Sequence, residues 1–182
     1  MRTLLLLLPL TLLVPACAND DATSEASSEV NARTTARRAQ LARLQRVDAL
    51  ARLYVGHELD RKELRGLGSK NEAAVIEELV KRPDFKTRFS GRLAEFMETN
   101  GKKPTSRDVD PNAPLVDAFS GAGEAKKAEA QRFGRWLVRE LAPRVADELL
   151  AKHDGQLAEM TYKELLDAIR TFSANPERGR TG

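Results

Sequence analysis

The chain has 182 residues and a formal net charge of +3, and its 41% hydrophobic and 31% charged residues are close to those of an ordinary soluble protein. This length suits one domain behind a tether. Cys17 is the only cysteine, so the sequence excludes an intrachain disulfide, a thiolate zinc site and a C-x-x-C-H haem attachment.

The charge is distributed unevenly along the chain. Residues 18–30 have a net charge of −4, residues 31–103 hold 17 basic against 10 acidic residues, and residues 104–182 hold 12 against 13. The basic part favours an anionic partner such as lipid phosphates or a wall polymer. Its bases are interspersed with acids and form no long block, so a solvated, arginine-rich surface is the competing interpretation.

Residues 1–16 have the pattern of a signal peptide. One positive charge precedes an apolar run of 11 residues, which is too short for the roughly 20 that span a bilayer. The segment ends in Val14-Pro-Ala-Cys17, which resembles the lipobox of bacterial lipoproteins. That resemblance implies cleavage between Ala16 and Cys17, and multiple acylation that makes Cys17 the membrane anchor. The competing interpretation is an ordinary signal peptide that is cut at Ala16 or Ala18.

The residues after the cysteine bear on location and on the tether. Ala18 stands where a retention signal for the inner membrane more typically has Asp, so the resemblance implies the outer membrane, if the cell has one. Residues 17–30 are small, polar and acidic, and such a segment cannot bury enough surface to offset the entropy of ordering. We therefore expect the lipidated cysteine and a flexible, disordered tether over 17–30, a helical domain over 31–175 and a frayed tail over 176–182.

Hydrophobic residues recur at helical spacing through the first part of the domain. From Asn31 to about Val55, apolar residues at spacings of 3 and 4 predict one amphipathic helix. Asp60-Arg-Lys-Glu63 and Ser69-Lys-Asn-Glu72 have the pattern of capping boxes, which predicts two further helix starts. Pro83 breaks the chain before a strongly amphipathic helix over 85–100. The apolar stripe of that helix consists of Phe85, Phe89, Leu93 and Phe96.

Glycine and proline divide the second part of the domain. A loop over 101–113 precedes a short helix over 114–119, and a longer helix is predicted over 124–141. Pro143 restarts the chain towards Leu150, and Thr161-Tyr-Lys-Glu164 caps the last helix. No segment alternates with period two for long enough to predict a strand. The sequence therefore predicts an all-α fold, a single globular bundle of about six or seven short amphipathic helices.

Three short motifs suggest chemistry, and each has a simpler structural interpretation. His57-Glu58 resembles the start of an H-E-x-x-H zinc helix, but Arg61 stands where the second histidine belongs. Asp108-Val-Asp110 has the opening spacing of an EF-hand loop, yet positions 6 and 12 of that loop are Ala and Phe. The glycines and the serine of Gly66-Leu-Gly-Ser-Lys70 fit helix capping better than a phosphate loop.

The usual catalytic patterns are also missing from the sequence. It has no G-x-S-x-G elbow, and none of its glutamates is followed by Ser, as the catalytic glutamate of lytic transglycosylases typically is. Trp136 and the Phe stripe fit a hydrophobic core better than a ligand-binding box. We therefore expect no catalytic residue, no metal and no cofactor.

Two segments together resemble a known kind of domain. Leu53-Tyr-Val-Gly-His-Glu-Leu-Asp60 and the later Pro83-Asp-Phe85 are similar to uncharacterised secreted helical domains related to phycobilisome linkers. The similarity covers about 35 residues; Gly56 would match the family's glycine, and Asp60 its acidic helix start. His57 departs from the pattern, which has arginine there. The resemblance implies an all-α assembly or linker module without catalytic residues.

These observations lead to an expected function. We expect a lipid-anchored protein of the cell envelope, not an enzyme, whose helical domain binds another macromolecule. The expected partners are the membrane, through the lipid on Cys17, and a protein or an anionic envelope polymer, with no nucleic acid. The alternatives are an envelope hydrolase that acts on wall or surface glycans through carboxylates, and a small-molecule carrier with an apolar cavity.

Overall fold

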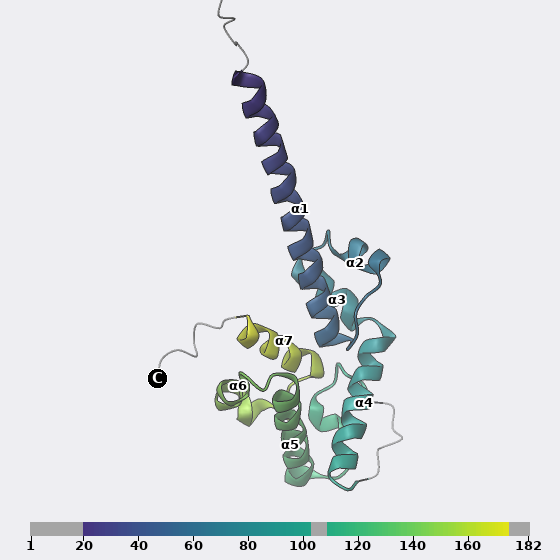
Figure 1. Ribbon diagram of the computed structural model, residues 1–182. Coiled ribbons are helices and arrows are strands. Elements are labelled where there is room, and N and C mark those ends of the chain that lie inside the picture. Colours follow the sequence, from purple (N-terminus) through teal and green to yellow (C-terminus); the bar gives the residue numbers. More distant parts are fainter. Residues whose placement is uncertain (1–19, 103–108, 175–182) are drawn as a thin grey trace, which may run out of the picture. The chain divides into compact units, whose positions relative to one another are not determined.

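The computed structural model describes residues 20–102 and 109–174, with side chains from Val30 onward. These ranges form seven α-helices, two short 3-10 helices and no strand, which confirms the all-α prediction there (Figure 1). The elements are α1 (Asp20–Tyr54), α2 (Arg61–Leu67), α3 (Glu72–Val80), α4 (Pro83–Thr99), η1 (Leu115–Ala118), α5 (Gly123–Leu141), α6 (Ala146–His153), η2 (Asp154–Gln156) and α7 (Tyr162–Ser173). The predictions for residues 1–16, for Ala16 and Cys17, and for the tail over 176–182 lie outside the described residues.

The first helix begins earlier than the sequence predicts. Helix α1 starts at Asp20, inside the segment expected to be a tether, rather than at Asn31. The sequence from Asp20 to Val30 contains Ala and Glu, which favour helices, and neither Pro nor Gly, so nothing in it ends a helix. The chain divides into two compact units, Met1–Leu41 and Ala42–Gly182, and α1 contributes residues to both.

In the first unit, the described structure is the part of α1 up to Leu41. Every side chain from Val30 to Leu41 is exposed. The second unit holds the hydrophobic core, and α5 lies at its centre, where it packs against α4, α6, α7 and both 3-10 helices.

Aromatic side chains fill the centre of the second unit. The ring of Phe133 on α5 is fully buried and lies 5.2 Å from that of Phe96 and 5.8 Å from that of Phe119, measured between centroids. The predicted stripe on α4 is confirmed as core, because Phe85, Phe89, Leu93 and Phe96 are each at most 3% exposed. Trp136 is half-buried and stacks on Phe133 at 6.1 Å.

The caps show which local patterns decide the helix boundaries. Asp60 and Thr161 form the two capping boxes predicted for α2 and α7. The capping box predicted at Ser69 is wrong, because the side chain of Asn71 caps α3 and accepts a hydrogen bond from the backbone N–H of Ala74 at 2.9 Å. Ser69 instead donates from its hydroxyl to the carbonyl of Gly66. Asparagine is as good an N-cap as serine, and here it stands next to the first helical residue.

Candidate functional site

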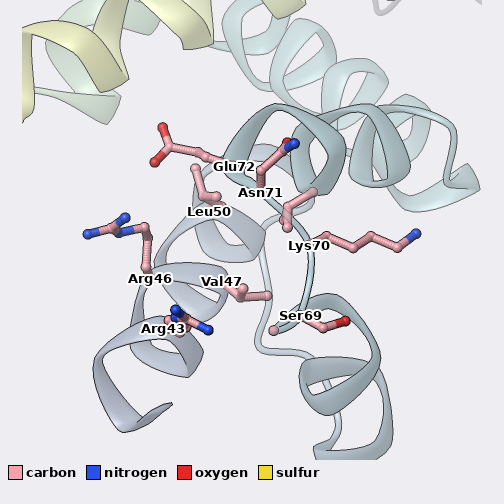
Figure 2. Close-up of a pocket in the computed structure, with 10 residues that line it drawn as sticks. Arg43, Arg46, Val47, Leu50, Ser69, Lys70, Asn71 and Glu72 are labelled. Atoms are coloured by element: carbon pink, nitrogen blue, oxygen red, sulfur yellow. The ribbon is translucent and has the colours of Figure 1, made fainter. Parts of the chain in front are cut away.

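A basic hollow lies between α1 and the start of α3, within the second unit (Figure 2). Its volume is about 390 Å³. The α1 side is formed by Arg43, Arg46, Val47 and Leu50, and the other side by Gly68, Ser69, Lys70, Asn71, Glu72 and Val75.

On α1, two buried hydrophobic residues and two exposed arginines line this hollow. Val47 and Leu50 are each 5% exposed and belong to the core, so they fix the orientation of α1. Arg43 and Arg46 are three residues apart on α1 and are both exposed. Across the hollow, a Cβ at Gly68 would lie only 2.8 Å from Cδ2 of Leu44, so the chain passes close to α1 here.

The hollow has an excess of positive charge. Neither Arg43 nor Arg46 has a hydrogen bond or ion pair with a residue that the structure describes. The single carboxylate among the lining residues, Glu72, is paired with the guanidinium of Arg170. Its charge is therefore compensated from α7 and leaves the two arginines unneutralised. Arginine keeps its proton at any physiological pH and presents a planar fork of donors to carboxylates and phosphates.

The third basic residue of the hollow is directed elsewhere. Nζ of Lys70 lies 3.1 Å from Oε1 of Glu78, and this contact lowers the pKa of the Glu78 carboxyl below its ordinary value. In Figure 2, Lys70 extends away from Arg43 and Arg46. The lining residues are thus suited to holding an anionic group by the two arginines, and they include no cysteine, histidine or pair of free carboxylates that would act on it.

A second hollow, of about 530 Å³, gathers the acidic residues that a hydrolase would need. It is lined by Glu72, Ala73, Ile76, Glu77, Lys163, Asp167 and Arg170. Asp167 accepts a hydrogen bond from the buried hydroxyl of Tyr54 and lies 2.6 Å from Nζ of Lys163. Burial, together with this carboxylate, raises the pKa of the Tyr54 hydroxyl above its ordinary value. The hydrogen bond joins α1 to α7, and the ion pair of Glu72 with Arg170 joins α3 to α7, so these carboxylates have structural partners.

The motifs singled out in the sequence are not brought into one site. His57 is exposed, with Nδ1 2.8 Å from the carbonyl of Glu58 and Nε2 3.3 Å from Oδ2 of Asp84. The ring of His153 packs against that of Phe172 at 6.0 Å, with different partners. In the described part of the chain, no group of three or more His, Cys, Asp or Glu side chains is placed to hold a metal ion.

The calcium-loop pattern is only partly visible. Oδ1 of Asp110 accepts a hydrogen bond from the backbone N–H of Asn112 at 2.9 Å, which is a local turn. Asp108 lies outside the described residues. The sequence located the basic part of the chain but did not distinguish Arg43 and Arg46 within it. The spacing of the two arginines beside the hydrophobic Val47 and Leu50 is a sequence signal that could have indicated them.

The comparisons with known proteins give no assignment: no family model, no curated protein and no solved structure matches the chain. The resemblance to domains related to phycobilisome linkers therefore stays a prediction. In the structure, Pro83 and Phe85 open α4, three residues beyond the end of α3 at Val80. Among the described helices, none is both long enough and apolar enough to span a bilayer.

Proposed function

We propose that this protein is a lipid-anchored component of the cell envelope whose helical domain binds an anionic macromolecule and does no catalysis. The proposed anchor is Cys17, from the lipobox pattern of Val14 to Cys17. The proposed contact surface is the basic hollow. One observation carries the proposal: Arg43 and Arg46 face a hollow whose only carboxylate is already paired with Arg170.

The chemistry of the two arginines decides the class of partner. A phosphate or carboxylate group that bridges two guanidinium groups forms charge-assisted hydrogen bonds, which are shorter and stronger than neutral ones. Because both arginines are exposed, each contact adds little affinity by itself, and salt weakens it. A polymer that presents many anionic groups compensates for this weakness through repeated binding. The partner that fits best is therefore a repeating polyanion of the envelope.

The test is a charge reversal with a matched control. The variant Arg43→Glu/Arg46→Glu is compared with Arg61→Glu/Arg144→Glu, which changes the net charge equally at two exposed arginines outside the hollow. Binding to a soluble polyphosphate is measured by titration calorimetry at low salt. We expect the dissociation constant of the first variant to rise at least about tenfold, and that of the control by less than about threefold. An equal loss of affinity in both variants would show that net charge alone causes the binding, and it would contradict the hollow as the binding site.

The alternative function is a hydrolase that uses the carboxylates of the second hollow. The purified chain is incubated with wall glycan, and new reducing ends are counted over time. The proposed function predicts none above the buffer blank. Release that is abolished in Glu77→Gln, which has no ion pair to lose among the described residues, would establish the hydrolase and contradict a non-catalytic domain.

A further inference from the structure

In the first unit, none of the side chains of α1 that the structure describes is buried. All twelve side chains from Val30 to Leu41 are exposed, including Val30 at 62% and Leu41 at 52%. These two apolar residues are eleven positions apart, which on an α-helix returns to within about 20° of the same face. Because most helical stability comes from packing, a helix of this kind is suited to binding another surface.

The charges of this helix are ordered along its axis. Residues 20–29 contain four acidic residues and no basic one: Asp20, Asp21, Glu25 and Glu29. Residues 30–41 contain three basic residues and no acidic one: Arg33, Arg37 and Arg38. At a rise of 1.5 Å per residue, positions 25 and 37 are about 18 Å apart on one helix, too far to pair within the chain. Only positions 29 and 33 have the spacing of an intrahelical pair.

A second copy of the same helix, running antiparallel, complements this order. In the register in which paired positions sum to 62, position 25 stands opposite Arg37 and position 29 opposite Arg33. A parallel, in-register pair would instead place acidic positions beside acidic ones and basic beside basic, which is unfavourable.

We infer that two copies of this chain associate through antiparallel pairing of residues 20–41 of α1. The inference rests on the charge order of residues 20–41 and on the exposure of residues 30–41, and it is independent of the hollow in the second unit. An association built on exposed charges is weakened by salt, because ions screen it over about 10 Å at 0.1 M. Its specificity comes from the orientation, since only one orientation brings opposite charges together.

The test uses the chain from Ala18 onward, which keeps every residue that the structure describes and removes the lipid. Sedimentation velocity is measured at protein concentrations from about 1 to 200 µM, in low and in high salt. We expect a reversible dimer whose dissociation constant rises at least about tenfold between roughly 50 and 500 mM NaCl. A chain that stays monomeric at 200 µM in low salt overturns the inference.

Charge exchange then tests the interface and its orientation. Arg33→Glu/Arg37→Glu and Glu25→Lys/Glu29→Lys are each expected to be monomeric, because each makes the helix nearly uniform in charge. The quadruple variant Glu25→Lys/Glu29→Lys/Arg33→Glu/Arg37→Glu restores opposite charges at both pairs of the antiparallel register, 25 with 37 and 29 with 33, and is expected to dimerise again. Arg61→Glu/Arg144→Glu is the control and should dimerise like the parent chain. A dimer that survives either double variant, or a quadruple variant that stays monomeric, contradicts pairing through this helix.

Circular dichroism keeps this result interpretable. The compact second unit contains the whole hydrophobic core, which begins at Val47, so changes in residues 20–41 leave its cooperative unfolding intact. Each variant is included only after its urea unfolding midpoint matches that of the parent chain at 1 µM. Loss of the dimer in a variant with an unchanged midpoint then reports on the interface.

Discussion

The two parts of α1 share one helical backbone but differ in the burial of their side chains. Up to Leu41 the described side chains are all exposed, and the charges are separated along the axis. From Val47 onward the helix turns Leu50, Ala51 and Tyr54 into the core, each at most 5% exposed. A continuous helix is therefore not a unit of stability, because only its second part gains from burial.

The difference separates two roles. Removing a buried side chain from the second part of α1 should affect unfolding of the compact unit, whereas the same change in the first part should affect association only. The first part keeps its helix through intrinsic propensity and, in the proposed dimer, through contact with the second copy. Four predictions follow from this contrast between buried and exposed positions, beginning with the largest expected effect.

Two leucines of α1 provide the most direct comparison. Leu50 is 5% exposed and Leu41 is 52% exposed. Leu50→Ala should lower the free energy of unfolding by about 2–4 kcal/mol, since it removes apolar contacts and leaves a cavity. Leu41→Ala should change it by less than about 0.5 kcal/mol. Urea unfolding at 1 µM, followed by circular dichroism, measures both, and equal losses would show that the first part of α1 belongs to the core.

Two glycines inside helices extend the contrast to the second unit. A Cβ at Gly134 on α5 would lie 2.9 Å from Cβ of Leu157, whereas one at Gly91 on α4 would meet nothing within 4 Å. Gly134→Ala should cost about 1–3 kcal/mol through overpacking, offset in part by better helix propensity. Gly91→Ala should stabilise the protein by about 0.5–1 kcal/mol. Thermal unfolding of both variants checks the two opposite signs.

The cap of α3 tests an exposed position that still matters. Asn71→Ala should lower the free energy of unfolding by about 1 kcal/mol, because the backbone N–H of Ala74 loses its acceptor. Ser69→Ala is the matched control and should cost less than about 0.5 kcal/mol. A larger loss of stability for Ser69→Ala than for Asn71→Ala in urea unfolding would instead support the capping box that the sequence predicts at Ser69.

The smallest effect is a pH dependence at His57. Its hydrogen bond with the backbone of Glu58, and then its contact with Asp84, raise the pKa of the imidazole above its ordinary value. The stabilisation is therefore fully present below the ordinary pKa near 6.5 and is lost as pH rises through the higher pKa of the folded state. Because the side chain is 49% exposed, the contribution should be below about 0.5 kcal/mol.

An NMR titration of the His57 ring and a comparison of unfolding midpoints between pH 5.5 and 8 measure this effect. The variant His57→Gln should reduce the pH dependence of the unfolding midpoint over that range. An imidazole pKa below the ordinary value would contradict the arrangement around His57.

Much of the fold follows from local patterns in the sequence. The stripe from Phe85 to Phe96 has helical spacing, and the boxes at Asp60 and Thr161 satisfy their own backbone donors, so these elements need no tertiary information. The start of α1 at Asp20 does not follow from composition, because a small, polar and acidic segment argues against burial but not against a helix. The spacing of Ser69 to Glu72 fits a capping box, but Asn71 competes for the same role and caps α3.

The basic hollow was harder to predict than the fold. Composition locates the basic part of the chain, but the separation of Arg43 and Arg46 from other arginines depends on where each carboxylate finds its partner. Glu72 is paired with Arg170, which lies 98 positions away in the sequence, and no local pattern reveals that contact. The charge left in the hollow is thus a property of the folded chain, not of the residues near it.

The contact between Tyr54 and Asp167 also limits how this domain can be made. The two residues are 113 positions apart, so the hydroxyl of Tyr54 cannot reach this carboxylate until α7 has been synthesised. Because contacts between distant residues close only after the intervening chain is available, the compact unit should complete its core late, near the end of translation. A nascent chain arrested before α7 should consequently remain more sensitive to proteases than the completed chain.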